Sequence, residues 1–327
     1  MSQRLEELQR WLRESCGLDG FELAPASEDA SFRRYFRVHF ADGGTRIVMD
    51  APPDREKCEP FLEVAARLEA AGVHAPRVHE QDLERGFLLL EDLGERSYLD
   101  ALDEASVEPL YGNALGALMS MQACIDPAGL PPYDRALLME EMELFREWLL
   151  ETHLSMALTG AEGDMLDEAF ALLAENALEQ PRVFVHRDYH SRNLMAGVSP
   201  EPGVIDFQDA VEGPVTYDLV SLLRDCYVRW PRERVEEWAW GYFRLAVQSG
   251  VMREEQEERF MRWFDLMGVQ RHLKASGIFA RLYHRDSKPG YLADIPRTLG
   301  YVVEVGQGYP ELEPLATFVE EKVLSVL

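Results

Sequence analysis

Cysteine is scarce in this sequence, and its four residues lie far apart. Cys16, Cys58, Cys124 and Cys226 include no C-x-x-C pair and stand at no Cys/His spacing typical of a zinc site. This pattern argues against a disulfide framework and against a structural metal centre, and it is typical of reduced thiols in a cytoplasmic protein. We therefore expect a cytoplasmic location.

Long hydrophobic runs are also lacking. No apolar stretch approaches the roughly 20 residues that a membrane-spanning helix requires. Leu5, Leu8 and Leu12 recur at helical spacing, but charged residues stand between them, which predicts an amphipathic helix and not a signal peptide. We expect no membrane partner.

Positive charge is in short supply, with 33 Lys and Arg against 59 Asp and Glu and a formal net charge of −26. This excess of negative charge disfavours binding to nucleic acid or to anionic membranes. A site for a phosphate-bearing ligand must therefore be locally basic, so clusters of arginine are informative. The partners we expect are small molecules, bound by a monomer.

The chain divides into two parts with different patterns. Hydrophobic residues make up 46% of its 327 residues, enough for a globular protein with two lobes. Residues 1–93 alternate in the manner of strands at 32–40, 46–50, 73–78 and 86–90, and a helical pattern covers 60–71. The later helical patterns lie at 107–125, 135–158, 163–178, 215–229, 233–249 and 254–283. We predict an α+β fold with a small β-rich N-terminal lobe (1–93) and a larger helical C-terminal lobe (94–327).

Polar residues gather in one stretch between two short strand-like runs, residues 183–209. His186, Asp188 and Asn193 follow the first run in the spacing H-x-D-x-x-x-x-N, and Asp206 directly follows the second run. Because the chain has only three Asn, a shuffled sequence would match this spacing about 0.005 times. The alternative is an ordinary hairpin with a polar loop; we prefer a site for chemistry.

This stretch resembles the core of protein kinase-like phosphotransferases, in which a loop Asp accepts the proton of the acceptor hydroxyl. Longer strings narrow the resemblance to the aminoglycoside phosphotransferase and choline kinase superfamily: 186–193 (HRDYHSRN), 204–210 (VIDFQDA), Gly213-Pro214 and 217–219 (YDL). Further strings are similar to the bacterial anomeric kinases of cell-wall recycling: 30–36 (ASFRRYF), 48–53 (VMDAPP), 216–227 (TYDLVSLLRDCY) and 270–274 (QRHLK). Those kinases phosphorylate N-acetylmuramate and N-acetylglucosamine at C1. The resemblance runs from about residue 4 to residue 301.

The resemblance implies a bilobal protein kinase-like fold and a phosphotransferase that uses ATP and Mg²⁺. It makes Asp188 the catalytic base, in contact with the acceptor, and Asn193 and Asp206 the ligands of Mg²⁺. Phosphoryl transfer requires mainly positioning and charge neutralisation, which explains the carboxylate and amide oxygens at these places. By position, Glu91 and Leu93 would line the adenine site through backbone groups.

The nucleotide-binding loop departs from the wider kinase pattern. Residues 27–34 (SEDASFRR) lack the glycines of a G-x-G-x-x-G loop. Backbone amides near Ser31 and Phe32 could still approach phosphates.

A second departure concerns the phosphate-pairing Lys. The strand that should present it reads IVMD at residues 47–50 and contains no Lys. We hypothesise that Arg33 or Arg34 supplies this positive charge. The alternative is a pair of solvated strand charges.

Several neighbours of the motif have open roles. His186 braces the loop by a hydrogen bond or touches phosphate, and we favour the brace. Arg187 and Arg192 face phosphate or pair with local acids. Asp218 caps the following helix or braces the loop. His190 is expected to be a loop or surface residue without a role.

The acceptor site is assigned by charge. N-acetylmuramate carries a lactyl carboxylate, so a cationic partner would help to bind it. Arg224, Arg271 and Lys274 in the helical lobe are the candidates, and the alternative for each is a solvated helix charge. Asp209 contacts the sugar hydroxyls or fixes the turn after Asp206.

We therefore expect a Mg-ATP-dependent sugar kinase that phosphorylates the anomeric C1 hydroxyl of N-acetylmuramate and N-acetylglucosamine in peptidoglycan recycling. An aminoglycoside or choline-type phosphotransferase is the alternative enzyme, since an acidic lobe suits polycations. A nucleotide-binding regulator (pseudokinase) is the alternative of another class. The missing Lys and glycines favour it, while intact Asp188, Asn193 and Asp206 count against it. No A-P-E-type segment follows Asp206, which disfavours a protein kinase.

Overall fold

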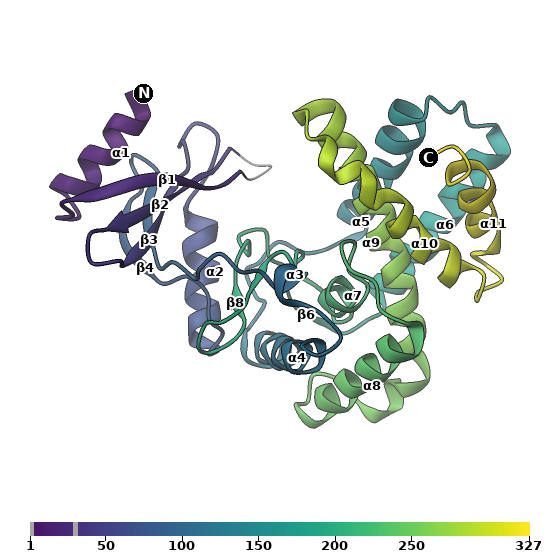
Figure 1. The fold of residues 1–327 in the computed structure, drawn as a ribbon. Helices are drawn as coiled ribbons and strands as arrows, with labels where there is room; N and C mark the ends of the chain where they lie inside the picture. The colour runs from purple at the N-terminus through teal and green to yellow at the C-terminus, as the bar shows by residue number, and fades with distance from the viewer. Residues whose placement is uncertain (1–2, 29–31) are drawn as a thin grey trace. The chain divides into compact units, whose positions relative to one another are not determined.

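The computed structural model describes residues 3–28 and 32–327, and the chain forms two compact units (Figure 1). The first unit extends to Arg96 and also includes residues 195–208, while the second comprises residues 97–194 and 209–327. The chain passes from the second unit to the first inside β7 (Leu194–Met195), which pairs with β8 (Gly203–Val204).

The first unit is built on a five-stranded antiparallel sheet with the strand order β1-β2-β3-β5-β4. Its strands are β1 (Phe21–Glu28), β2 (Arg34–Phe40), β3 (Thr45–Asp50), β4 (Val78–Asp82) and β5 (Phe87–Leu90). Two helices belong to the same unit, α1 (Gln3–Glu14) and α2 (Glu59–Ala70). Leu8, Trp11 and Leu12 form the buried stripe of α1 and pack on the sheet, where the ring of Trp11 lies 5.6 Å from that of Phe87.

Two strands of this sheet differ from the sequence-based prediction. β1 is absent from that prediction because Pro25 interrupts the strand-like pattern. The sheet tolerates Pro25 because β1 is an edge strand whose register with β2 shifts between Pro25 and Ser27. The strand predicted at 73–78 is wrong, since β4 begins only at Val78, beyond Pro76, which has no N–H to donate.

The second unit is mainly helical and is arranged around α9 (Glu257–Asp286), which is buried along most of its length and lies beside α5 and α10 (Figure 1). The other helices are α3 (Tyr98–Ala101), α4 (Val107–Cys124), α5 (Arg135–Leu144), α6 (Gly160–Leu178), α7 (Tyr217–Leu223), α8 (Arg232–Gln248), α10 (Ile295–Gly306) and α11 (Glu313–Phe318). Short π-helical segments are η1 (Phe145–His153) and η4 (Val319–Val323), and 3₁₀ segments are η2 (Glu254–Gln256) and η3 (Pro289–Asp294). β6 (Arg182–Val185) pairs antiparallel with β9 (Val211–Pro214).

Two predicted helices are shorter than expected. The helix predicted at 215–229 ends at Leu223, because the Asp225 carboxylate accepts a hydrogen bond from the Tyr227 N–H (2.8 Å) and turns the chain. The helix predicted at 135–158 changes at Leu144 into the π-helical η1. Gly277 of α9 lies directly against this junction, where a Cβ would come within 2.3 Å of the Leu144 carbonyl.

Within residues 3–28 and 32–327, no helix is both long enough and apolar enough to cross a membrane.

A side chain at Gly277 should destabilise the second unit. In Gly277→Ala the new methyl group would overlap the Leu144 backbone, and we expect the free energy of unfolding to fall by about 1–3 kcal/mol. Gly116→Ala in α4 is the matched control, because a Cβ there meets no atom within 4 Å. It should raise the free energy of unfolding by up to about 1 kcal/mol. Urea unfolding of both variants measures the difference, and equal stabilities would contradict the close packing of α9.

Candidate active site

Asp188 lies in the loop of residues 186–193 that follows β6; we call this segment the Asp188 loop. Arg187 has a φ of 77°, a left-handed conformation that is unfavourable for a residue with a Cβ. Within the loop, the Asn193 side-chain amide donates a hydrogen bond to the Asp188 carbonyl (3.0 Å). A backbone of this shape forms no helix or strand ladder, so its N–H groups need other partners.

Two buried carboxylates supply those partners. Asp218 in α7 accepts hydrogen bonds from the backbone N–H groups of His186 (2.7 Å) and Arg187 (3.0 Å). Asp225, just beyond α7, accepts one from Ser191 (2.8 Å). The brace expected of Asp218 is therefore present, whereas the N-cap position of α7 is Thr216, which makes no side-chain cap hydrogen bond. Asp225 is a residue that the sequence analysis missed.

The two histidines of the loop are both buried. The Asp188 N–H donates a hydrogen bond to Nδ1 of His186 (3.3 Å), which confirms the loop-bracing interpretation of that residue. His190 lies in the loop, as one of its two expectations had it, but not at the surface, since it is 8% exposed and its ring lies 5.4 Å from that of Tyr227. His190 is held in the interior of the site and is not a surface residue.

The Asp188 carboxylate has positive charge around it. Burial alone would raise its pKa. Nearby basic groups lower it by more, and they are Lys274, His190, Arg187 and Arg271. The pKa of Asp188 therefore lies below its usual value, so the carboxylate is ionised at neutral pH and can accept a proton.

Glu141 on α5 is the buried counter-charge of two of these groups, Lys274 and Arg187. It pairs with Lys274 (2.9 Å between Oε1 and Nζ) and with Arg187, and it accepts a hydrogen bond from the Tyr133 hydroxyl. Burial raises the pKa of Glu141. The charges of Lys274 and Arg187 lower this pKa by more than burial raises it, so it lies below its usual value. Arg187 thus pairs with a local acid, one of its two expected roles. Sequence analysis missed Glu141, although an acid on the apolar face of a predicted helix is a usable signal.

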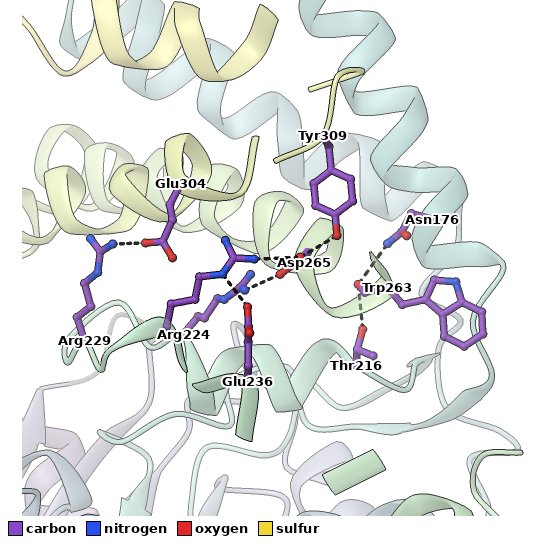
Figure 2. Close-up of polar contacts among 10 residues, drawn as sticks. Asn176, Thr216, Arg224, Arg229, Glu236, Trp263, Asp265, Glu304 and Tyr309 are labelled. Carbon is purple, nitrogen blue, oxygen red and sulfur yellow. Dashed lines mark hydrogen bonds and ion pairs between the residues drawn. The ribbon is translucent and has the colours of Figure 1, made fainter. Parts of the chain in front are cut away.

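The three cations proposed for the acceptor are all buried, so the alternative of solvated helix charges is wrong for each. Arg224 pairs with Asp265, which also accepts a hydrogen bond from the Tyr309 hydroxyl (2.7 Å; Figure 2). Lys274 donates to the Tyr217 hydroxyl (2.9 Å) besides pairing with Glu141.

Arg271 differs from the other two cations. Its Nη1 lies 3.5 Å from the Cys226 sulfur, and in the part of the chain that the structure describes no carboxylate lies within ion-pair distance. Asp209 is exposed in a turn and, among the same residues, has no hydrogen-bond partner. The structure therefore does not support the turn-fixing role for Asp209.

In the first unit, acids engage both arginines expected to meet phosphate. Arg33 pairs with Glu56 (2.9 Å), which also accepts a hydrogen bond from the Phe32 N–H (3.2 Å). Arg34 pairs with the buried Asp50. The solvated alternative is wrong for Arg33, which is 8% exposed, whereas the side chain of Arg34 is 44% exposed. Ser31 lies outside the described residues.

The segment expected at the adenine site is anchored inside the first unit. The Glu91 N–H donates to the Arg77 carbonyl (2.8 Å), and the Arg77 N–H donates to the Glu91 carboxylate (3.3 Å). Leu93 is buried and lies against Gly203, whose added Cβ would come within 2.8 Å of the Leu93 side chain. A pocket of about 610 Å³ beside α2 includes Glu91 but none of the other proposed site residues.

Asn193 and Asp206 carry the oxygen atoms expected to hold Mg²⁺. Asp206 has a φ of 63°, and its carboxylate accepts a hydrogen bond from the Gln208 side chain (2.8 Å). Outside residues 1–2 and 29–31, no three His, Cys, Asp or Glu side chains form a metal cluster. Asn193 belongs to the second unit and Asp206 to the first. Each supplies an oxygen of a type that Mg²⁺ accepts, and Mg²⁺ is usually bound by few protein ligands together with nucleotide phosphates.

The chain belongs to the phosphotransferase enzyme family, which matches residues 22–264. It is 49% identical to an N-acetylmuramate/N-acetylglucosamine kinase of Pseudomonas aeruginosa, with 95% of each chain covered. It is 47% identical to a kinase of the same name from Pseudomonas putida, covering 97% of this chain and 96% of the relative. Plasmodium vivax ethanolamine kinase has the same fold, with a TM-score of 0.64 at 12% identity over 90% of this chain and 85% of that one. The predicted α+β, protein kinase-like fold class and the superfamily resemblance are confirmed.

Removing the charge of Glu141 should leave the buried Lys274 and the half-buried Arg187 without their partner. We expect Glu141→Gln to lower the free energy of unfolding by about 3–5 kcal/mol, because an uncompensated buried charge is costly. Glu143→Gln on the same helix is the matched control, since Glu143 pairs with Arg146 at a partly exposed position and should contribute less than about 1 kcal/mol. Chemical unfolding of both variants tests this. A small effect for Glu141→Gln would mean that water reaches the cations.

Asp218 should make stability depend on pH. Burial raises its pKa to about 7, against the lowering effect of the two N–H donors. Because the unfolded pKa is about 3.9, the folded state holds the proton more tightly, and this stabilisation is lost as the pH rises through about 7. As the pH rises from about 4 to 7, the wild type should therefore lose stability relative to Asp218→Asn, by up to roughly 1.4 kcal/mol per pH unit.

Urea unfolding across this range measures the effect of Asp218. Asp126→Asn is the control for losing a carboxylate at the surface, since Asp126 is exposed and accepts the Ala128 N–H (3.0 Å). Parallel pH curves for wild type and Asp218→Asn would show that Asp218 is ionised throughout.

Proposed function

We propose that this chain is an ATP- and Mg²⁺-dependent sugar kinase that phosphorylates the anomeric C1 hydroxyl of N-acetylmuramate and N-acetylglucosamine in peptidoglycan recycling. The observation that carries the proposal is the cluster of cations, Lys274, Arg187 and Arg271, around Asp188. Such surroundings suit an anionic acceptor such as N-acetylmuramate, and they oppose a polycationic aminoglycoside or a choline-like amine. The names of the two Pseudomonas relatives support the same acceptors.

The proposed chemistry starts at the Asp188 carboxylate. Held ionised by its neighbours, it orients the C1 hydroxyl of the sugar and takes its proton as the phosphoryl group is transferred. The Asp218 and Asp225 hydrogen bonds keep the loop in one geometry, so the carboxylate does not have to be repositioned for each turnover.

The other site residues act by binding. We propose that Asn193 and Asp206 hold Mg²⁺, which neutralises charge on the ATP phosphates. The nucleotide contacts we propose belong to the N-terminal lobe (1–93): Ser31, Phe32, Arg33, Arg34, Glu91 and Leu93. The acceptor contacts belong to the C-terminal lobe (94–327): Asp188, Asp209, Arg271, Lys274 and Arg224. Of these, Arg224 is the weakest proposal, because Asp265 already neutralises it. We further propose a cytoplasmic monomer without nucleic-acid or membrane partners.

The test is ADP release from Mg-ATP with a panel of acceptors: N-acetylmuramate, N-acetylglucosamine, kanamycin, choline and a blank without acceptor. We expect turnover with the two amino sugars only, and a loss of about 10²–10⁴-fold in kcat for Asp188→Asn. Asp126→Asn, an exposed acid of the same unit, is the control and should leave kcat unchanged.

Each other outcome would change the assignment. Turnover with kanamycin or choline would keep the fold and replace the acceptor. ATP binding without turnover on any acceptor would favour the nucleotide-binding regulator. Full activity of Asp188→Asn would remove Asp188 from the role of base.

A further inference from the structure

Arg192 is a cation without an acidic partner in a very acidic chain. The sequence has 59 Asp and Glu against 33 Lys and Arg, so most exposed cations can find a carboxylate. Yet across residues 3–28 and 32–327 no Asp or Glu lies within ion-pair distance of Arg192, which is exposed. Its guanidinium carbon instead lies 4.8 Å from the ring centroid of Tyr227 and 5.2 Å from that of Tyr291. The expectation that Arg192 pairs with a local acid is therefore not met.

The same buried carboxylate fixes Arg192 and one of its aromatic partners. Asp225 accepts a hydrogen bond from the N–H of Ser191, next to Arg192, through one oxygen. Through the other oxygen it accepts the N–H of Tyr227 (2.8 Å). The Asp225 side chain therefore holds both the backbone next to Arg192 and the backbone of Tyr227, on whose ring the Arg192 guanidinium lies.

The two rings have support of their own. Tyr291 stacks on Phe279, with 5.6 Å between ring centroids and 22° between planes, and Tyr227 lies 6.1 Å from the same Phe279. Arg192 also interacts with both tyrosines by side-chain hydrogen bonds. A guanidinium carries five N–H donors, so donors remain for a planar anion. Arg192 is thus preorganised, since little of its side-chain freedom remains to be lost when a ligand binds.

The position of Arg192 limits which ligand it can meet. It stands in the Asp188 loop, four residues after Asp188, and its positive charge acts on His190 in the same loop. Arg271, a buried cation that also lacks a carboxylate within ion-pair distance among the described residues, contacts Cys226, which directly precedes Tyr227. Two arginines without ion-pair partners therefore contact the adjacent residues Cys226 and Tyr227, and one of them, Arg192, stands in the loop of the candidate base.

We propose that Arg192, stacked on Tyr227 and Tyr291, is a specificity-determining residue that binds the carboxylate of an anionic acceptor. The inference rests on the proposed function, under which the lactyl group of N-acetylmuramate carries that carboxylate and N-acetylglucosamine lacks it. A bidentate pair between guanidinium and carboxylate gives both charge and geometry to this contact. Arg192 then separates the two sugars by binding and takes no part in the chemistry.

The experiment compares kcat/KM for three acceptors, N-acetylmuramate, its uncharged carboxamide and N-acetylglucosamine. We expect Arg192→Gln to lower kcat/KM for N-acetylmuramate by about 10- to 100-fold, mainly through KM, because a charge-assisted hydrogen bond is lost. The carboxamide and N-acetylglucosamine should change by less than about twofold, since they have no carboxylate to lose. Arg192→Lys, which keeps the charge but not the planar group, should lie between wild type and Arg192→Gln.

Arg135→Gln is the matched control, because Arg135 is exposed in the same unit and pairs with Glu175 (3.2 Å). It should leave all three acceptors unchanged. Equal losses on the three acceptors in Arg192→Gln would overturn the proposal and point to the ATP phosphates. If Arg192→Gln keeps the wild-type kcat/KM for all three acceptors, the proposal is also overturned, and Arg192 only packs against the two tyrosines.

Calorimetric binding of N-acetylmuramate, which needs no turnover, separates this inference from the proposed function. A wild-type protein that phosphorylates neither sugar overturns the proposed function. Equal affinity of wild type and Arg192→Gln for N-acetylmuramate overturns the role of Arg192, and weaker binding by Arg192→Gln alone supports it.

Discussion

The hydrogen bonds that Asp218 and Asp225 accept from the Asp188 loop are the constraint on which the candidate site depends. The loop satisfies the N–H groups of His190 and Asn193 by its own carbonyl groups, but those of His186, Arg187 and Ser191 depend on the two acids. The two acids are seven residues apart, and every residue of α7 (Tyr217–Leu223) is buried. The buried helix α7 and the residue just beyond it thus fix the shape of the loop, so the packing of α7 also positions the candidate base.

The neighbours of Asp188 create a positive potential at its carboxylate, although the chain as a whole is strongly negative. Lys274 and Arg187 share the buried Glu141, and the remaining positive potential falls on Asp188 and lowers its pKa. A carboxylate with a low pKa is a weak base, so it suits an acceptor hydroxyl that is itself comparatively acidic. The anomeric hydroxyl of a sugar is more acidic than a simple alcohol, in agreement with the proposed acceptor.

Features with a local signal in the sequence were predictable. The α+β class followed from the change of periodicity near residue 93, and the spacing of His186, Asp188 and Asn193 marked the loop. Features that depend on distant contacts were not. β1 contains Pro25, which only an edge strand tolerates, and pairing is needed to identify an edge. Glu141 and Asp225 were missed because their partners lie 46 and 34 residues away in the sequence.

The burial of Arg271 and Lys274 is the clearest example of such a distant effect. The two residues are three apart on α9, so they share one face of a helix that is buried along most of its length. Charges in such a place persist only if something neutralises them. Glu141 forms an ion pair with Lys274, whereas Arg271 has no carboxylate partner within ion-pair distance among the described residues. Asp225 and Asp188 act on Arg271 from beyond ion-pair distance. An anionic acceptor would supply the direct partner that Arg271 lacks, while a polycationic acceptor would add charge of the same sign. The electrostatics of α9 therefore favour the same class of acceptor as the surroundings of Asp188.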